Sequence, residues 1–220
     1  MKTILAFETS TGFLSVALGN EKGKISEAFS KRPLRHSENL IPLLDKLLKK
    51  ERLALSEIDA FAIDRGPGSF TGLRIGFSLL KGFLAVRKRP CYGALSLDMM
   101  TAKVRLAEGS RLAVVVDARR DLIYSRFYRA RRREWVSERK LELLSLSQLS
   151  SRLSKETLLV GESLARYTSE IEVRPAFPCA RTLVDWFHEK NPRLTRLEAP
   201  RDFVPLYFRA SEAEERKRKK

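Results

Sequence analysis

Short apolar runs separated by small polar turns open the chain, a pattern typical of paired β-strands. Thr3–Phe7 and Phe13–Leu18 flank a polar turn from Glu8 to Gly12, and Lys24–Phe29 follows a second turn. Each run has the length of a strand and is bounded by turn residues. We therefore expect three successive strands that form a β-meander.

The apolar period then changes to that of helices. Leu40, Ile41 and Leu44 place apolar side chains on one face of a helix for which Ser37 is the expected N-cap. Phe70–Val86 is apolar around nearly its whole circumference, which predicts a helix that is buried or at an interface. The other elements expected in this half are strands at Ile58–Ile63 and Cys91–Gly93 and a helix that begins at Ser96.

The strand pattern starts again near Ser110. Leu112–Val116, an acidic turn at Asp117–Asp121 and Leu122–Tyr128 repeat the architecture of the first strands without repeating their letters. Further on we expect helices at Leu146–Leu153 and Ala180–Glu189, a strand at Thr157–Val160 and an extended segment at Phe203–Arg209. These elements predict an α/β protein with one lobe at residues 1–109, a second at 110–210 and a charged tail at 211–220.

Composition restricts the class of protein. Lys and Arg number 43 against 27 Asp and Glu, giving a net charge of +16, which indicates either a polyanionic partner or the charge-rich surface of a heat-adapted protein. Cys91 and Cys179 are isolated in sequence, so we expect buried thiols rather than a disulfide or zinc site. The apolar stretch Ile4–Phe7 is too short for a membrane span, and we expect a cytoplasmic protein.

A glycine-rich segment, GPGSFTGLRIG at Gly66–Gly76, lies between a predicted strand and the long apolar helix. Such a loop binds phosphate in some folds and is a plain structural turn in others. Neither GK[ST] nor GxGxxG follows, so the sequence lacks the P-loop and Rossmann patterns. Gly72 and Gly76, four residues apart, would let another helix approach closely.

Several segments together resemble the TsaB family, also called YeaZ. The glycine-rich segment resembles that family's hallmark most closely, and the resemblance extends over almost the whole chain. Its other parts are ILAFETSTGFLSVAL near the start, HSENLIPLLDKLL from His36, VVVDARRDLIY from Val114 and PLYFRASEAE from Pro205. The resemblance implies the two-lobed α/β fold of the actin, sugar kinase and Hsp70 superfamily, with its ribonuclease H-like motif and a reduced second lobe.

That superfamily holds ATP between two acidic hairpins. The first hairpin corresponds here to Glu8, Thr9, Ser10, Thr11 and Gly12. The second begins at Asp117 but has Ala118, Arg119 and Arg120 where glycines are expected, and side chains there block close approach of the backbone to a phosphate. We therefore expect no nucleotide hydrolysis by this chain alone; the alternative is that Arg119 and Arg120 bind phosphate directly.

Metal and hydrolase motifs are missing from the sequence. The related catalytic subunit TsaD carries an HxxxH metal site, whereas only His36 and His188 occur here, far apart. His36, which precedes a helix, is expected to be a surface or capping residue. Without HExxH or a GxSxG nucleophile elbow, a metallopeptidase or serine hydrolase is not supported. The expectation is that ATP and metal belong to partner subunits.

The resemblance implies that the chain pairs with TsaD through helices of the first lobe. A homodimer through the same helices is the alternative. The interface residues expected are Ser37, Leu40, Ile41, Leu44, Phe70, Gly72, Leu73, Gly76, Phe77 and Leu80, with Gly82 also permitting close packing.

The segment from Arg119 to Lys140 is rich in arginine, with Tyr124, Phe127, Tyr128 and Trp135 interleaved. Cations for phosphates and rings for stacking would suit tRNA. The alternative is that the rings are core and the arginines are solvated. The residues proposed for tRNA contact are Arg129, Arg131, Arg132 and Arg133.

Three functions remain open. The resemblance favours a non-catalytic partner of TsaD that acts, with the ATPase TsaE, in transferring a threonylcarbamoyl group to the adenosine next to the tRNA anticodon. The alternatives are a small ATPase or kinase that uses Glu8, Thr9 and Asp117, and a stand-alone homodimer that binds RNA.

Overall fold

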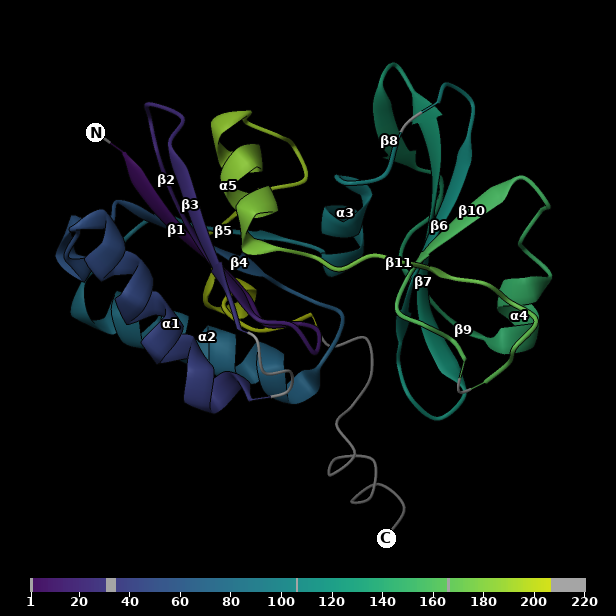
Figure 1. Ribbon diagram of the computed structural model, residues 1–220, viewed down its shortest axis with the longest axis horizontal. Coiled ribbons are helices and arrows are strands. Elements are labelled where there is room, and N and C mark those ends of the chain that lie inside the picture. The colour runs from purple at the N-terminus through teal and green to yellow at the C-terminus, as the bar shows by residue number, and fades with distance from the viewer. Residues whose placement is uncertain (1, 31–34, 106, 166, 207–220) are drawn as a thin grey trace, which may run out of the picture. The chain divides into compact units, whose positions relative to one another are not determined.

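The computed structural model describes residues 2–30, 35–105, 107–165 and 167–206 (Figure 1). The described residues form two compact units, one made of residues from 2–95 and 179–206 and the other of residues from 96–178. Each unit contains one sheet with helices against it, so the α/β class is confirmed.

The first unit is built on a six-stranded sheet with the order β12-β5-β4-β1-β2-β3. Its first three strands form the predicted antiparallel meander, and β4 and β5 continue the sheet parallel to β1. This arrangement is the ribonuclease H-like motif. The strands are β1 (Thr3–Glu8), β2 (Ser15–Asn20), β3 (Ile25–Phe29), β4 (Ala60–Asp64), β5 (Cys91–Ala94) and β12 (Thr195–Leu197).

Helices cover both faces of this sheet. On one face lie α1 (His36–Glu51) and α2 (Phe70–Val86), whose apolar side chains share a core with β1, β2 and β4. The ring of Phe83 stacks on that of Phe61, with 5.4 Å between centroids. On the other face α5 (Ala180–His188) packs across β1 to β4 (Figure 1). Two short 3-10 turns complete the unit, Leu55–Glu57 and Pro200–Asp202.

The second unit has a sheet with the order β11-β10-β6-β7-β8, and β9 pairs with the other end of β7. One apolar cluster lies between this sheet and α3 (Ser96–Thr101), and another lies between the sheet and α4 (Leu146–Ser150). The strands are β6 (Arg111–Asp117), β7 (Leu122–Arg131), β8 (Glu134–Ser137), β9 (Glu142–Ser145), β10 (Thr157–Gly161) and β11 (Arg174–Pro175). Its helices are short, consistent with a reduced second lobe.

The division into units differs from the lobes expected at residues 1–109 and 110–210. Residues 179–206 return to the first unit because α5 covers its sheet and β12 pairs with β5. The chain enters the second unit at Ser96, where α3 packs on β6. The charged tail at 211–220 and the end of the expected segment Phe203–Arg209 lie outside the described residues.

Two local expectations are corrected. Ser37 is not the N-cap of α1, because the helix already includes His36 and Arg35 precedes it without a side-chain capping bond. His36 is not a surface residue, since it is only 4% exposed and burial lowers its pKa. Cys91 and Cys179 are free and buried, as expected, and burial raises the pKa of the Cys91 thiol to about 12.

No helix among the described residues has both the length and the apolar character needed to cross a membrane.

Candidate functional site

The glycine-rich segment packs directly on the turn between β1 and β2. The Ser69 amide donates a hydrogen bond to the carbonyl oxygen of Ser10 over 2.5 Å, and the Ser69 hydroxyl caps α2 by accepting from the Gly72 amide. A Cβ atom at Gly68 would lie 2.1 Å from the Ser10 carbonyl oxygen, and one at Gly72 would lie 2.1 Å from that of Thr9. Glycine is required at both positions because the hairpin backbone occupies the space of a side chain.

Two carboxyl groups meet beneath this contact. The Ser10 hydroxyl lies 2.8 Å from Glu8 Oε1 and 2.7 Å from Asp64 Oδ2, while Asp64 Oδ1 accepts from the Gly66 amide. Glu8 Oε1 also accepts from the Ser10 amide. The serine has a single hydroxyl proton and cannot donate to both acids at once. If one of the two carboxyl groups keeps its proton, that group donates to the Ser10 hydroxyl oxygen while the hydroxyl donates to the other carboxylate.

Burial determines which form this pair adopts. Glu8, Ser10 and Asp64 are all fully buried. Desolvation, together with the nearby charge of Asp64, raises the pKa of Glu8 well above its usual value. A protonated carboxyl group is a poor ligand for a cation. The first hairpin is a closed turn whose backbone packs against Gly68 and Gly72.

In the second hairpin, which begins at Asp117 in the other unit, the acidic side chain also contacts neighbouring residues. Asp117 accepts from the Tyr167 hydroxyl over 2.5 Å and forms an ion pair with Arg119 over 3.2 Å. Arg119, Arg120 and Asp121 all adopt positive φ, so the turn keeps the backbone that glycine would favour while carrying side chains. Each left-handed residue of this kind costs roughly 1 kcal/mol.

Within the described ranges, no group of three or more His, Cys, Asp and Glu side chains is placed to hold a metal ion.

Most of the residues expected at the partner interface are buried inside the first unit. Gly72 and Gly76 face Thr9 of the same chain, so the expectation that they admit a partner helix is wrong. Also buried in the core of this unit are Leu40, Leu44, Leu73, Phe77 and Leu80. Of the expected set, Ser37 and Ile41 are exposed and Phe70 is partly exposed under Arg74, whose guanidinium lies 3.9 Å from the ring centroid.

Another face of α2 is open instead. A Cβ atom at Gly82 would meet nothing within 4 Å, and the exposed positions Ser78 and Ala85 flank Gly82 on this side of the helix. Ile41 is 59% exposed on the outer face of α1. Sequence periodicity missed this division because α2 is apolar nearly all round and does not show which side the sheet covers.

The arginine-rich segment forms the hairpin of β7 and β8. Its rings are not available to stack on bases, because Phe127, Tyr128 and Trp135 are buried in the second unit and Tyr124 packs against the same core. That part of the expectation is wrong, and the alternative that the aromatics are core is confirmed. Arg129 forms an ion pair with Glu138, whereas the three expected tRNA contacts at the turn, Arg131, Arg132 and Arg133, are exposed.

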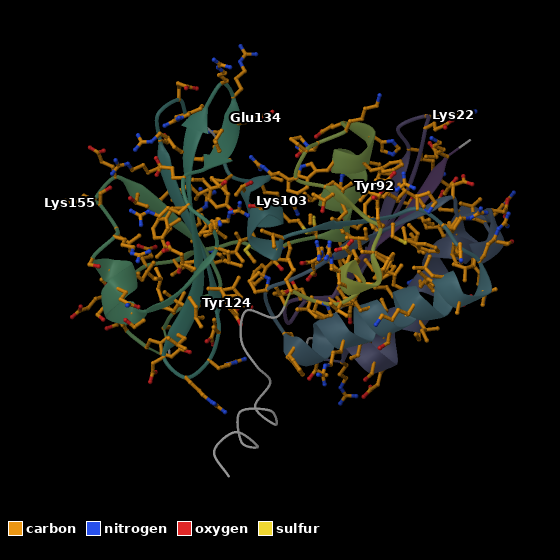
Figure 2. All side chains as sticks on the ribbon, turned by 180° about the vertical axis from the view of Figure 1, so that it is seen from behind. Lys22, Tyr92, Lys103, Tyr124, Glu134 and Lys155 are labelled. Carbon is orange, nitrogen blue, oxygen red and sulfur yellow. The ribbon has the colours of Figure 1, made fainter. Side chains whose placement is uncertain are left out.

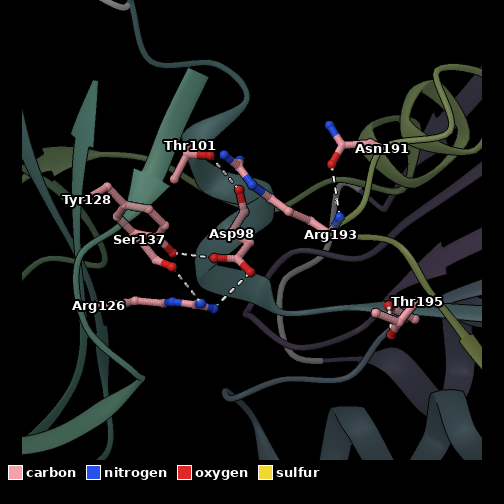
Figure 3. A network of polar contacts seen from close by, with 9 residues as sticks. Asp98, Thr101, Arg126, Tyr128, Ser137, Asn191, Arg193 and Thr195 are labelled. Carbon is pink, nitrogen blue, oxygen red and sulfur yellow. Dashed lines mark hydrogen bonds and ion pairs between the residues drawn. The ribbon is translucent and has the colours of Figure 1, made fainter. Parts of the chain in front are cut away.

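A buried polar network that sequence reasoning missed fastens α3 to the second sheet (Figure 3). Asp98 accepts from the Tyr128 hydroxyl over 2.5 Å and from the Arg126 guanidinium over 2.9 Å. Arg126 also donates to the Ser137 hydroxyl on β8. Asp98 and Arg126 thus form an ion pair that joins α3 to β7. Its only signal in the sequence is an acidic residue inside the apolar run SLDMMT.

Comparisons with protein families and with curated proteins both find matches named for tRNA threonylcarbamoyladenosine or its synthesis. A family model described as "TsaD: tRNA N6-adenosine threonylcarbamoyltransferase" matches residues 31–168. The "tRNA threonylcarbamoyladenosine biosynthesis protein TsaB" of Escherichia coli is 31% identical over 72% of this chain and 70% of its own. The protein with the same description in Bacillus subtilis is 27% identical over 96% of both chains.

A solved structure shows the same fold. A Pseudomonas aeruginosa protein described as having similarity to the peptidase YeaZ superposes with a TM-score of 0.75 at 26% identity, covering 95% of this chain and 100% of that one. Similarity therefore extends over nearly the whole chain.

Proposed function

The chain belongs to the TsaB family, and we propose that it is a non-catalytic partner subunit in the synthesis of tRNA threonylcarbamoyladenosine. In this proposal it pairs with TsaD in the cytoplasm. TsaD, with the ATPase TsaE, carries out the transfer of the threonylcarbamoyl group to the adenosine beside the anticodon. The nucleotide and metal are bound by those partners rather than by this chain alone.

The closed first hairpin carries this proposal. An ATPase of this fold needs an ionised acid to position a metal or a water molecule, and backbone amides open to the phosphates. Here Glu8 is buried with a raised pKa, and the backbone turn is covered by Gly68 and Gly72. In the second hairpin Asp117 is occupied by Tyr167 and Arg119.

The outer face of α1 and α2 is the surface that we propose for TsaD. Ile41 supplies an exposed apolar side chain, and Gly82 allows another helix to approach the backbone. Because this face is on helices whose opposite sides are buried, it is presented on a rigid support.

A charge on this face tests the pairing. We expect Ile41→Glu to abolish or strongly weaken co-elution with TsaD in size-exclusion chromatography, because the new carboxylate would be desolvated without a partner. Val136→Glu, at a position 43% exposed on the second sheet, is the matched control and should elute with TsaD like the wild type. If Ile41→Glu and wild type form equal amounts of complex, this face is not the interface.

Calorimetry on the isolated chain separates the proposal from the ATPase alternative. We expect no heat of binding and no turnover when ATP and Mg²⁺ are added. Micromolar binding with hydrolysis would overturn the non-catalytic assignment.

A further inference from the structure

Cationic side chains from two separate segments converge at one end of the second sheet. The tip of the β7–β8 hairpin is tied to the chain that precedes β6: Gly109 donates to the Ala130 carbonyl, and the Arg132 amide donates to Glu108 Oε1. The Trp135 indole N–H donates to the carbonyl oxygen of Val104 over 3.3 Å. These bonds bring the basic residues of both segments together.

We call this set the basic end of the second sheet. Its members are Lys103, Arg105, Arg111, Arg129, Arg131, Arg132 and Arg133. They outnumber the nearby acids Glu108, Glu134 and Glu138, and Glu138 is already paired with Arg129. At the tip, Arg131, Arg132 and Arg133 form no ion pair with a carboxylate of the described chain.

The backbone of the turn gives an independent indication. Arg132 and Arg133 have φ values of 50° and 65°, so the two residues that connect β7 and β8 are both left-handed. A two-residue turn of this kind strongly prefers Asn-Gly, and arginine at both positions opposes folding. Residues held in an unfavourable backbone conformation cluster at functional sites, and this turn is therefore where we look for a use outside the fold.

We propose that the basic end binds the phosphate backbone of RNA. This rests on the proposed function, in which the substrate is a tRNA. Guanidinium groups match phosphate with paired hydrogen bonds, and the rings of this hairpin are buried, so contact is with phosphates rather than with bases. Binding is therefore insensitive to sequence and depends strongly on salt.

The test replaces the turn with the pair that its backbone prefers. Arg132→Asn with Arg133→Gly removes two charges while relieving the left-handed strain, so it should raise the Tm by a few degrees. Affinity for an unmodified tRNA transcript should fall, and the slope of log Kd against log salt should decrease by about 1.4–1.8. The matched control, Lys140→Gln with Lys155→Gln, removes two exposed charges from other loops of this unit and should leave the slope unchanged (Figure 2 labels Lys155).

Three results would overturn the inference: an Asn-Gly variant with the affinity and salt slope of the wild type, an equal loss in the control, or displacement of the tRNA by polyglutamate as effectively as by RNA of equal charge. The last would identify an acidic protein as the partner. Co-elution of the Asn-Gly variant with TsaD separates this inference from the proposed function. If the Asn-Gly variant still pairs with TsaD but binds RNA more weakly, the result supports RNA binding by the basic end. If the wild type binds RNA through this end but does not pair with TsaD, only the proposed function is contradicted.

Discussion

Two glycines of α2 differ in what surrounds them, and alanine at each should have opposite effects on stability. At Gly72 the new methyl group would be 2.1 Å from the carbonyl oxygen of Thr9, a backbone atom that cannot rotate away. At Gly82 the methyl group would enter open space. The pair therefore tests whether the glycine-rich segment is a packing element.

The magnitudes follow from the two environments. Alanine in an exposed helix interior is better than glycine by about 1 kcal/mol, so Gly82→Ala should stabilise by up to this amount. Forcing a methyl group into a filled space costs about 1–3 kcal/mol, so Gly72→Ala should destabilise even though alanine favours the helix. For a chain of this size 1 kcal/mol shifts the Tm by about 2–4 °C, so the two Tm values should differ by at least about 2 °C.

Urea denaturation followed by circular dichroism measures both variants beside the wild type. We expect the lowest unfolding midpoint for Gly72→Ala, an intermediate one for the wild type and the highest for Gly82→Ala, with similar m-values. An unfolding midpoint for Gly72→Ala equal to or above the wild type would mean that the hairpin does not press on α2, and the packing role of this segment would be refuted.

Two further substitutions probe the buried polar groups. Burial raises the pKa of Glu8, so its contribution to stability is complete below its unfolded pKa near 4.5 and is lost as pH rises through the folded pKa. Glu8→Gln should therefore flatten the fall in unfolding free energy as pH rises above the unfolded pKa, and an unchanged slope would count against a retained proton. Tyr128→Phe should cost about 1.5–3 kcal/mol in thermal unfolding because Asp98 loses a donor. Tyr92→Phe is its control, since that hydroxyl has no hydrogen bond to a described residue, and equal losses would show that the Asp98 bond is not the cause.

Sequence patterns predicted the elements where local signals are strong. Phe70–Val86 is helical over the expected span, and the meander follows from its turns. Strand β12 was missed because its hydrogen-bond partner, β5, is distant in sequence. Strand β8 was missed although a two-residue turn joins it to β7, because Arg132 and Arg133 do not carry the Asn-Gly signal of such a turn. The return of α5 to the first unit is likewise a long-range event, and amphipathic spacing does not indicate which sheet the helix covers.

The sequence identified the segments that form the site, but not how their side chains lie relative to one another. The acidic turn and the glycine-rich segment are plain in the sequence, yet nothing there indicates that Ser10 bridges Glu8 to Asp64, more than fifty residues away. Nor does apolar content distinguish Leu73, which is buried, from Ile41, which is exposed. These outcomes depend on tertiary contacts that form only when the sheet is complete.

Reconstituted transfer of the threonylcarbamoyl group to tRNA by TsaD and TsaE measures the proposed role most directly. We expect transfer to require this chain, to survive Glu8→Gln and Asp117→Asn, and to fail with Ile41→Glu. Loss of transfer with Glu8→Gln or Asp117→Asn, while the complex with TsaD remains intact, would contradict a non-catalytic partner.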